Sequence, residues 1–495
     1  MGEILEWAYG FVWGVPALLG ILGVGLYLSL RTGFFQIRSF PAACRAFWYR
    51  LTGKGASGEG VSSFQALCTA LSATVGTGNL VGVAGALAIG GPGAIFWMWV
   101  SAVLGMVTKL AEAALSVRYR DGEPGHRLAG PMYIIRNGMS PRWGWLAGLY
   151  SFFGVIAAFG VGNATQVDAL IGGLGGCVRF WGGELRASGE LLIGASLAVV
   201  VLILLLGGAG RIGAVAERLV PFAAAGYLLL GCLVLVLRAE AVPRALGQII
   251  RGAFDPGAVT GGAVGSFWGT MRIGVSRGVF TNEAGMGTAG IAHGAAEVDH
   301  PVEQGLMGIM EVFLDTIVIC TMTALVILCS GVPIGYGTDV GVMLSGDAFS
   351  LVLGDWVRPV IAFSLCLFAF ATILGWGVYG ARCAQYLFGK DVWGRFAWIQ
   401  AGVILIGATL STGTVWRLAE IVNGLMAIPN LIALAACSPE LCRLIIEYRK
   451  RSGDCAGGGK SCKYLSMPIV VNRPPCVNST PSRWRQRSRG RRSIT

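Results

Sequence analysis

The residues with the greatest capacity for chemistry stand in an apolar run that is long enough to cross a membrane. Residues 71–82 carry the hydroxyls of Thr74 and Thr77 and the amide of Asn79, interspersed with glycines. Each glycine lowers helix propensity by about 1 kcal/mol relative to alanine. Backbone N–H and C=O groups that lack a helical hydrogen-bond partner are tolerated at membrane depth only where they are buried in protein or line a water-filled cavity. The stretch therefore predicts a helix broken at residues 74–80, and we interpret it as half of a binding site.

A second interrupted stretch lies in the other half of the chain. Residues 277–287 carry Arg277, Asn282 and Glu283 together with three glycines, where a lipid-facing helix would be intolerable. Paired, glycine-interrupted segments at corresponding positions of two inverted halves indicate a transporter site near the bilayer midplane.

Two other function classes have weaker support. Residues 274–278 match the G-x-S-x-G pattern of serine hydrolases, with His293 as an imaginable base. That pattern needs a strand–turn–helix context, whereas here it precedes a broken membrane helix. Broken helices also line channels, but the two-halves symmetry and the lack of a repeated filter sequence argue against one. We expect no enzyme and no cofactor beyond a transported ion.

Ionisable residues inside the spans have competing interpretations. Lys109 and Glu112, three residues apart on one helix, are expected to pair with each other. Glu283 is expected to fix the unwound loop through hydrogen bonds, with a coupling proton as the alternative. His293 is expected to be a hydrogen-bonded interior histidine rather than a proton relay.

Glu311 and Asp315 are four residues apart, so they lie on one helical face. Two like charges there are unfavourable unless one is protonated or has a partner. Two explanations stay open, a role in coupling and ion pairing with Arg272 or Arg277.

The elements that position these residues follow from composition. The 495-residue chain is 54% hydrophobic and only 13% charged, which indicates an all-α, polytopic membrane protein. Its 13 cysteines are scattered without metal-ligand spacing, so neither a disulfide framework nor a zinc site is expected. The first apolar segment lacks a basic leader and a cleavage site, and we expect it to be a retained helix.

A span needs about 20 apolar residues, and this criterion predicts about eleven. They cover approximately residues 9–30, 64–88, 93–117, 147–171, 189–206, 217–237, 263–287, 305–330, 358–380, 394–412 and 415–437. Setting the first aside leaves two sets of five, each opening with a broken helix. The predicted units are an extra helix and cytoplasmic loop (1–62), two inverted repeats (63–262 and 263–440) and a tail (441–495).

Charged loops set the orientation. Five basic residues lie between residues 31 and 60, and five arginines follow the third span, whereas the connection before Arg358 carries Asp339, Asp347 and Asp355. The positive-inside rule then places the N-terminus outside and the C-terminus in the cytoplasm of a multi-pass protein of the cell (inner) membrane.

The net charge of +12 does not indicate a nucleic-acid partner, because it is concentrated in the tail. Residues 449–495 contain 12 Lys/Arg against one Asp, a net of +11. This segment is rich in Gly, Pro and Ser, so we expect disorder and contact with anionic lipid of the bilayer rather than RNA binding.

Several motifs closely resemble the alanine/glycine:cation symporter family. They are residues 76–84 (GTGNLVGVA), 90–99, 277–287 with 291–293, 315–321, 370–376 and 423–430. The resemblance spans roughly residues 60–440 and implies a LeuT-like, five-plus-five inverted-repeat fold of the APC superfamily. It also implies uptake of alanine or glycine with Na+ or, in some members, H+. The tail after about Ser452 resembles nothing in the family.

The predicted site combines helix-end chemistry with this resemblance. The N–H end of a half-helix attracts a carboxylate, so the amides near Gly78 and Asn79 are assigned to the substrate carboxylate and carbonyls near Phe280 and Thr281 to its ammonium. The resemblance adds Gln166 and Trp376 at the pocket. The predicted substrate-binding residues are Thr77, Gly78, Asn79, Gln166, Phe280, Thr281 and Trp376.

A Na+ site follows from the same fold class. It would combine the Thr372 hydroxyl with main-chain oxygens near Val75. The family pattern leads us to expect Phe-Ser-Thr here, but the chain has Ala371, which removes one hydroxyl. This departure leaves looser Na+ binding, a water in that place, or H+ coupling as alternatives.

Overall fold

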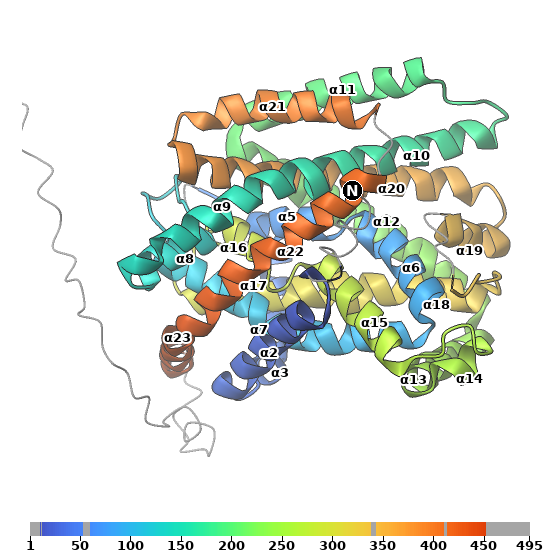
Figure 1. Ribbon diagram of the computed structural model, residues 1–495, viewed down its shortest axis with the longest axis horizontal. Helices are drawn as coiled ribbons and strands as arrows, with labels where there is room; N and C mark the ends of the chain where they lie inside the picture. The colour runs from blue at the N-terminus through green and yellow to red at the C-terminus, as the bar shows by residue number, and fades with distance from the viewer. Residues whose placement is uncertain (1–9, 11, 53–59, 338–342, 410–412, 452–495) are drawn as a thin grey trace, which may run out of the picture.

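The computed structural model describes the chain except residues 1–9, 11, 53–59, 338–342, 410–412 and 452–495. Figure 1 shows a bundle of helices, and the isolated β-bridges of the described residues are Val61 with Ala296 and Asp121 with Leu128. Most of the basic tail lies outside the described residues, so its predicted disorder and lipid contact stay predictions.

In chain order, the helices form three groups that follow the predicted units: the N-terminal segment, the first repeat, and the second repeat with the segment after it. The first is α2 (Val15–Thr32), α3 (Phe35–Arg38) and α4 (Phe40–Leu51). The second is α5 (Ser63–Thr74), η1 (Gly78–Gly82), α6 (Val83–Gly90), α7 (Gly93–Tyr119), α8 (Pro131–Gly138), η2 (Pro141–Trp143), α9 (Gly144–Phe159), η3 (Gly160–Ala164), α10 (Thr165–Phe180), α11 (Ala187–Leu206), α12 (Gly208–Leu237), η4 (Ala239–Ala241), α13 (Val242–Phe254) and α14 (Pro256–Thr260). The third is α15 (Phe267–Asn282), α16 (Thr288–His293), α17 (Pro301–Val312), η5 (Phe313–Cys320), α18 (Thr321–Ser330), α19 (Met343–Leu353), α20 (Val357–Phe388), α21 (Val392–Gly407), α22 (Gly413–Ala436) and α23 (Ser438–Arg451).

Long apolar helices confirm a polytopic membrane protein. Within the described residues, six helices are long and apolar enough to span a bilayer, or up to eight if each of two bent pairs counts as one span. Two further predicted spans fall on the shorter apolar helices α2 and α21. The remaining predicted span, residues 263–287, falls on α15, which has 16 residues and is therefore shorter than the six long apolar helices.

The first predicted break is a bend. The axes of Ser63–Thr74 and Gly78–Gly90 differ by 52°. In an unbroken helix the Gly76 amide would donate to the carbonyl four residues earlier; here it donates to Asn79 Oδ1 at 2.9 Å. At this break the Asn79 side-chain oxygen takes the place of the helical backbone carbonyl as the acceptor for the Gly76 amide.

The second break is a loop in left-handed conformation. Glu283, Gly285 and Gly287 have φ angles of 52°, 99° and 82°, and they separate α15 from α16. Glycine adopts such angles without strain, whereas glutamate does so only when its surroundings hold it there. The interruption is thus confined to the end of the predicted stretch.

Helix α7 is packed closely by α15 and α17. A Cβ atom on Gly274 or Gly278 of α15 would lie 2.2 Å from the Ala94 carbonyl oxygen or 2.3 Å from Ser101 Oγ. Small residues spaced by four let membrane helices approach this closely. The G-x-S-x-G match is therefore a helix-packing surface, and its context is helical rather than a strand followed by a turn.

Helix α20 is the second long helix at the centre, packed against α9, α10 and α5. Its Gly375 lies against α5, where an added Cβ atom would come within 2.6 Å of Ser72 Oγ. In Figure 1, α11 and α21 run side by side along one edge of the bundle, in agreement with their mutual packing.

Ion pairs at one end of the bundle join the basic loops to other segments. Glu297 lies 3.1 Å from Arg127 Nε and 3.4 Å from Arg120 Nη2. Partial burial raises the pKa of Glu297, but the hydrogen bonds from Arg127 and the Gly125 amide, with the charge of Arg120, hold it below its ordinary value. This end of the bundle is called the basic end below.

Candidate functional site

The two breaks meet at their glycine and threonine residues. A Cβ atom on Gly78 would lie 3.3 Å from Thr281 Cγ2 and 3.8 Å from the Phe280 ring. The N-terminal end of η1 and the last turn of α15 therefore face one another, as the sequence predicts for the two halves of a site.

Both the oxygen and the nitrogen of the Asn79 side-chain amide form hydrogen bonds within the protein. Its Oδ1 accepts from the Gly76 amide at 2.9 Å, and its Nδ2 donates to Asp315 Oδ1 at 2.7 Å. The side chain is fully buried. Asn79 thus shapes the first break, and its main-chain amide also donates to the Gly76 carbonyl, at 3.3 Å.

Asp315 connects both breaks through hydrogen bonds. Its Oδ2 accepts from Thr316 Oγ1 at 2.8 Å, and the same hydroxyl accepts from Asn282 Nδ2 at 3.1 Å. Asp315 therefore has amide and hydroxyl partners in place of the arginine partner considered from the sequence.

Gln166 of α10 and Trp376 of α20 form hydrogen bonds to the two breaks. Thr77 Oγ1 donates to Gln166 Oε1 at 3.2 Å, and Trp376 Nε1 donates to Glu283 Oε1 at 3.1 Å. Trp376 packs on Gly162, where an added Cβ atom would come within 2.2 Å of the Trp376 Cβ. These bonds join α10 and α20 to the first and second break respectively.

Thr372 lies directly against the first break. A Cβ atom on Gly76 would be 2.7 Å from Thr372 Oγ1, which donates to the Phe368 carbonyl at 3.0 Å. The hydroxyl oxygen can therefore still accept a bond or bind a cation beside Gly76. Ala371 is 2% exposed, so the position that lacks the hydroxyl is buried.

A buried charge network occupies the interface of α7, α16 and α17. Lys109 Nζ lies 2.8 Å from Glu311 Oε1, and His293 Nε2 lies 2.8 Å from Glu311 Oε2. The histidine is further held by Gln304 Nε2 at 2.6 Å from its Nδ1, as an interior hydrogen-bonded residue. All three ionisable side chains are fully buried.

This network corrects two expectations. Lys109 pairs with Glu311 of α17 rather than with Glu112, because α17 approaches α7 through glycines: a Cβ atom on Gly308 would lie 2.9 Å from the Lys109 carbonyl. The arginines considered as partners of Glu311 lie elsewhere, with Arg277 3.6 Å from Glu420 and Arg272 exposed.

Acidic residues fix the second break, as expected for Glu283. Glu283 Oε2 accepts from Thr288 Oγ1 at 2.6 Å. Glu112 Oε1 accepts from the amides of Gly285 and Gly287 at 2.9 and 3.0 Å. The role of Glu112 was missed because its spacing from Lys109 suggested a local pair. The available signal was a carboxylate within an apolar span.

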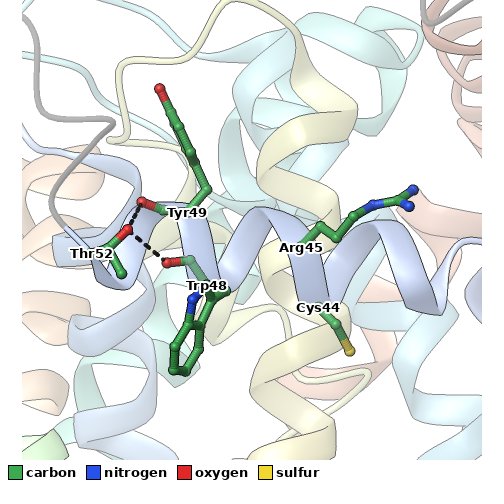
Figure 2. Close-up of a pocket in the computed structure, with 5 residues that line it drawn as sticks. All are labelled: Cys44, Arg45, Trp48, Tyr49 and Thr52. Atoms are coloured by element: carbon green, nitrogen blue, oxygen red, sulfur yellow. Dashed lines mark hydrogen bonds between the residues drawn. The ribbon is translucent and has the colours of Figure 1, made fainter.

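Cavities elsewhere in the described structure are separate from these breaks. Figure 2 shows one of about 510 Å³ on α4, lined by Cys44, Arg45, Trp48, Tyr49 and Thr52. Another of about 430 Å³ lies at the basic end between Val61, Arg127, Gly208 and Arg382. The described residues contain no group of three or more His, Cys, Asp or Glu that could hold a metal ion, so a cation here would need hydroxyl and carbonyl oxygens.

Comparisons with known proteins agree on one family. Residues 1–457 match the sodium:alanine symporter family. An uncharacterized transporter of Haemophilus influenzae is 43% identical over 453 residues, 90% of this chain and 95% of that protein. The sodium/alanine symporter AgcS of Methanococcus maripaludis is 40% identical over 436 residues, 86% of this chain and 93% of that protein.

A solved structure shows the same fold. The crystal structure of MhsT in complex with L-phenylalanine superposes with a TM-score of 0.54 at 16% identity, covering 77% of this chain and 90% of that one. The match to the family includes α2, which the sequence resemblance had left out, and ends near the start of the basic tail.

Proposed function

Since the chain belongs to the sodium:alanine symporter family, we propose that this cation-coupled amino-acid symporter imports alanine or glycine together with Na+. It is a multi-pass membrane transporter and not an enzyme. The observation that carries the proposal is the meeting of two broken helices at Gly78 and Thr281, beside Gln166 and Trp376.

The substrate site would bind both ends of a zwitterion. The main-chain amides at Gly78 and Asn79 begin η1, where the helix dipole favours a carboxylate, and the Thr77 hydroxyl lies beside them. Carbonyls at Phe280 and Thr281 end α15 and would accept from the ammonium. Trp376 is buried against Gly162, and a tryptophan wall here would favour a methyl group or hydrogen over bulky side chains.

The ion site would use oxygen ligands that suit Na+. Thr372 Oγ1 lies against Gly76 of the first break, and main-chain oxygens near Val75 would complete the ligand set. Because this break belongs to the substrate site as well, a cation there would order the backbone that binds the carboxylate. Coupling would follow from this shared segment, since a ligand shifts an equilibrium only through its differential affinity for two states.

Alternating access would move the helices that carry the breaks against those that face them. The bonds from Thr77 to Gln166 and from Trp376 to Glu283 cross this boundary. We further propose that the basic end faces the cytoplasm and the N-terminus lies outside, because Arg120 and Arg127 lie at the basic end, whereas the connection before Arg358 carries the acidic Asp347 and Asp355.

H+ coupling is the second candidate, and the loss of a hydroxyl at Ala371 favours it. The acidic residues considered for this role from the sequence are Glu283, Glu311 and Asp315, and each of them already accepts hydrogen bonds or pairs with a base. Sodium coupling has the stronger support, because the Thr372 hydroxyl lies against the first break and can still bind a cation.

The test is uptake of radiolabelled alanine into proteoliposomes under a Na+ gradient, repeated with a proton gradient alone. Uptake that requires Na+ and is abolished by Thr77→Ala supports the proposal. Thr52→Ala is the matched control, because in the described part of the chain this exposed hydroxyl bonds to the preceding helix alone, at the carbonyls of Trp48 and Tyr49 (Figure 2). Uptake with protons alone would refute sodium coupling, and no uptake of alanine or glycine under either gradient would refute the substrate.

A further inference from the structure

Within the described residues, Glu112 is bonded through one of its two carboxylate oxygens. Its Oε1 accepts the amides of Gly285 and Gly287 and also Asn430 Nδ2 of α22, at 2.9, 3.0 and 2.8 Å. The Asn430 amide donates in addition to the Gly285 carbonyl at 2.9 Å. A single oxygen atom thus connects α7, the second break and α22.

The Glu112 carboxyl group and the Asn430 side-chain amide become complementary when Glu112 takes up a proton. Glu112 Oε2 and Asn430 Oδ1 are both buried and have no hydrogen-bond partner among the described residues. Two acceptors cannot bond to each other, but a carboxylic acid and a primary amide pair through one O–H···O and one N–H···O bond. The N–H···O half of such a pair is present, at 2.8 Å.

We propose that Glu112 and Asn430 form a proton-binding site, in which a proton on Glu112 Oε2 is donated to Asn430 Oδ1 and fastens the second break to α22. The proton comes from water and returns to it, and no other bond changes. The site is distinct from the Na+ site at Thr372.

Burial favours a proton on Glu112, and the negative charge of Glu311 acts in the same direction, whereas Lys109 and the amides of Gly285 and Gly287 oppose it. Lys109, on the same helix, is paired with Glu311, which also binds His293. Glu283, on the break itself, is bonded to Thr288 and Trp376. The titratable groups that interact with Glu112 are Lys109, Glu311, Tyr150 and Tyr379. Glu283 and His293 join the same cluster through Lys109 and Glu311.

In this cluster of described residues, Lys109 is the one lysine beside three carboxyl groups, those of Glu112, Glu283 and Glu311. The hydroxyls of Tyr150 and Tyr379 are buried and without hydrogen-bond partners in the part of the chain described, so they add no compensating charge. An uncompensated buried charge is strongly unfavourable, and such a group is stabilised by taking up a proton.

Protonation should therefore control how firmly the second break is held. With the proton present, Asn430 holds the break through both of its amide atoms. Without it, the carboxylate and the amide oxygen repel each other, and α22 is held less firmly. Since the break carries Glu283 and adjoins the proposed ammonium site, alanine uptake should fall as the pH rises. This last step rests on the proposed function.

Infrared spectroscopy of the full-length protein in vesicles tests the site without transport. The carbonyl band of a protonated carboxyl group should be present at neutral pH and lost on alkalinisation. It should be missing in Glu112→Gln, whose amide reproduces the protonated shape. Glu303→Gln is the matched control, because Glu303 is a partly exposed partner of Arg50, and it should keep the band. A band that persists in Glu112→Gln would overturn the proposal.

A second variant and a second readout guard against a folding defect in Glu112→Gln. Asn430→Asp places two carboxyl groups opposite each other, and such a pair retains one proton to higher pH. The band should therefore survive to a more alkaline pH by about one unit, a tenfold gain in proton affinity. An unchanged titration would contradict the pairing. Glu112→Gln should also flatten the pH profile of alanine uptake; if it follows the wild-type profile, the link to transport is wrong. Loss of alanine uptake in the wild type would instead count against the proposed function alone.

Discussion

Replacing Gly76 by alanine should weaken Na+ coupling through a single steric contact. Gly76 lacks a left-handed φ angle, so alanine is allowed by the backbone, but its Cβ would lie 2.7 Å from Thr372 Oγ1. Ordinary van der Waals contact begins near 3.4 Å, so the hydroxyl or the break must move by about 0.7 Å, the difference of these distances. Overpacking of this kind costs about 1–3 kcal/mol, which corresponds to about a 5–150-fold change in an equilibrium constant.

The measurement is the Na+ concentration that gives half-maximal alanine uptake in proteoliposomes. We expect it to rise by about 5–150-fold in Gly76→Ala. Gly85→Ala is the matched control on the same broken helix, because an added Cβ there meets nothing within 4 Å, and it should leave the Na+ dependence unchanged. If both variants share the wild-type Na+ dependence, Thr372 is not a ligand of the coupled ion and the reasoning fails.

Three further changes test other parts of the structure. Lys109→Met leaves Glu311 buried without its cation, so thermal unfolding in detergent should show a loss of about 3–5 kcal/mol; an unchanged melting temperature would mean that the pair contributes nothing. Trp376→Phe removes the donor to Glu283, a hydrogen bond to a charged group worth about 1.5–3 kcal/mol, and alanine uptake should fall at least tenfold while membrane insertion persists. Because the pKa of Glu297 is lowered in the folded protein, its ionised form stabilises the fold above the ordinary pKa and this contribution is lost as the pH falls through the lowered value. Glu297→Gln should therefore unfold with a weaker dependence on acidic pH than the wild type, and identical profiles would refute this assignment.

The sequence by itself determined the class of protein and the places where helices break. Composition and the length of the apolar runs require a membrane bundle, because each apolar run must be buried or face lipid. The glycines around Thr77 and after Glu283 are local signals, since they act on the backbone of their own segment. The family motifs carried this further, to Gln166 and Trp376, which the structure brings to the two breaks.

Only the tertiary structure decided which side chain pairs with which. Lys109 has an acidic residue one turn away, yet it pairs with Glu311, 202 residues later in the chain. Asn430 reaches Glu112 across 318 residues. Local spacing ranks neighbours on one helix, but buried charges and amides are satisfied by whichever helix packs closest, and that choice depends on small residues such as Gly308 that let two backbones approach.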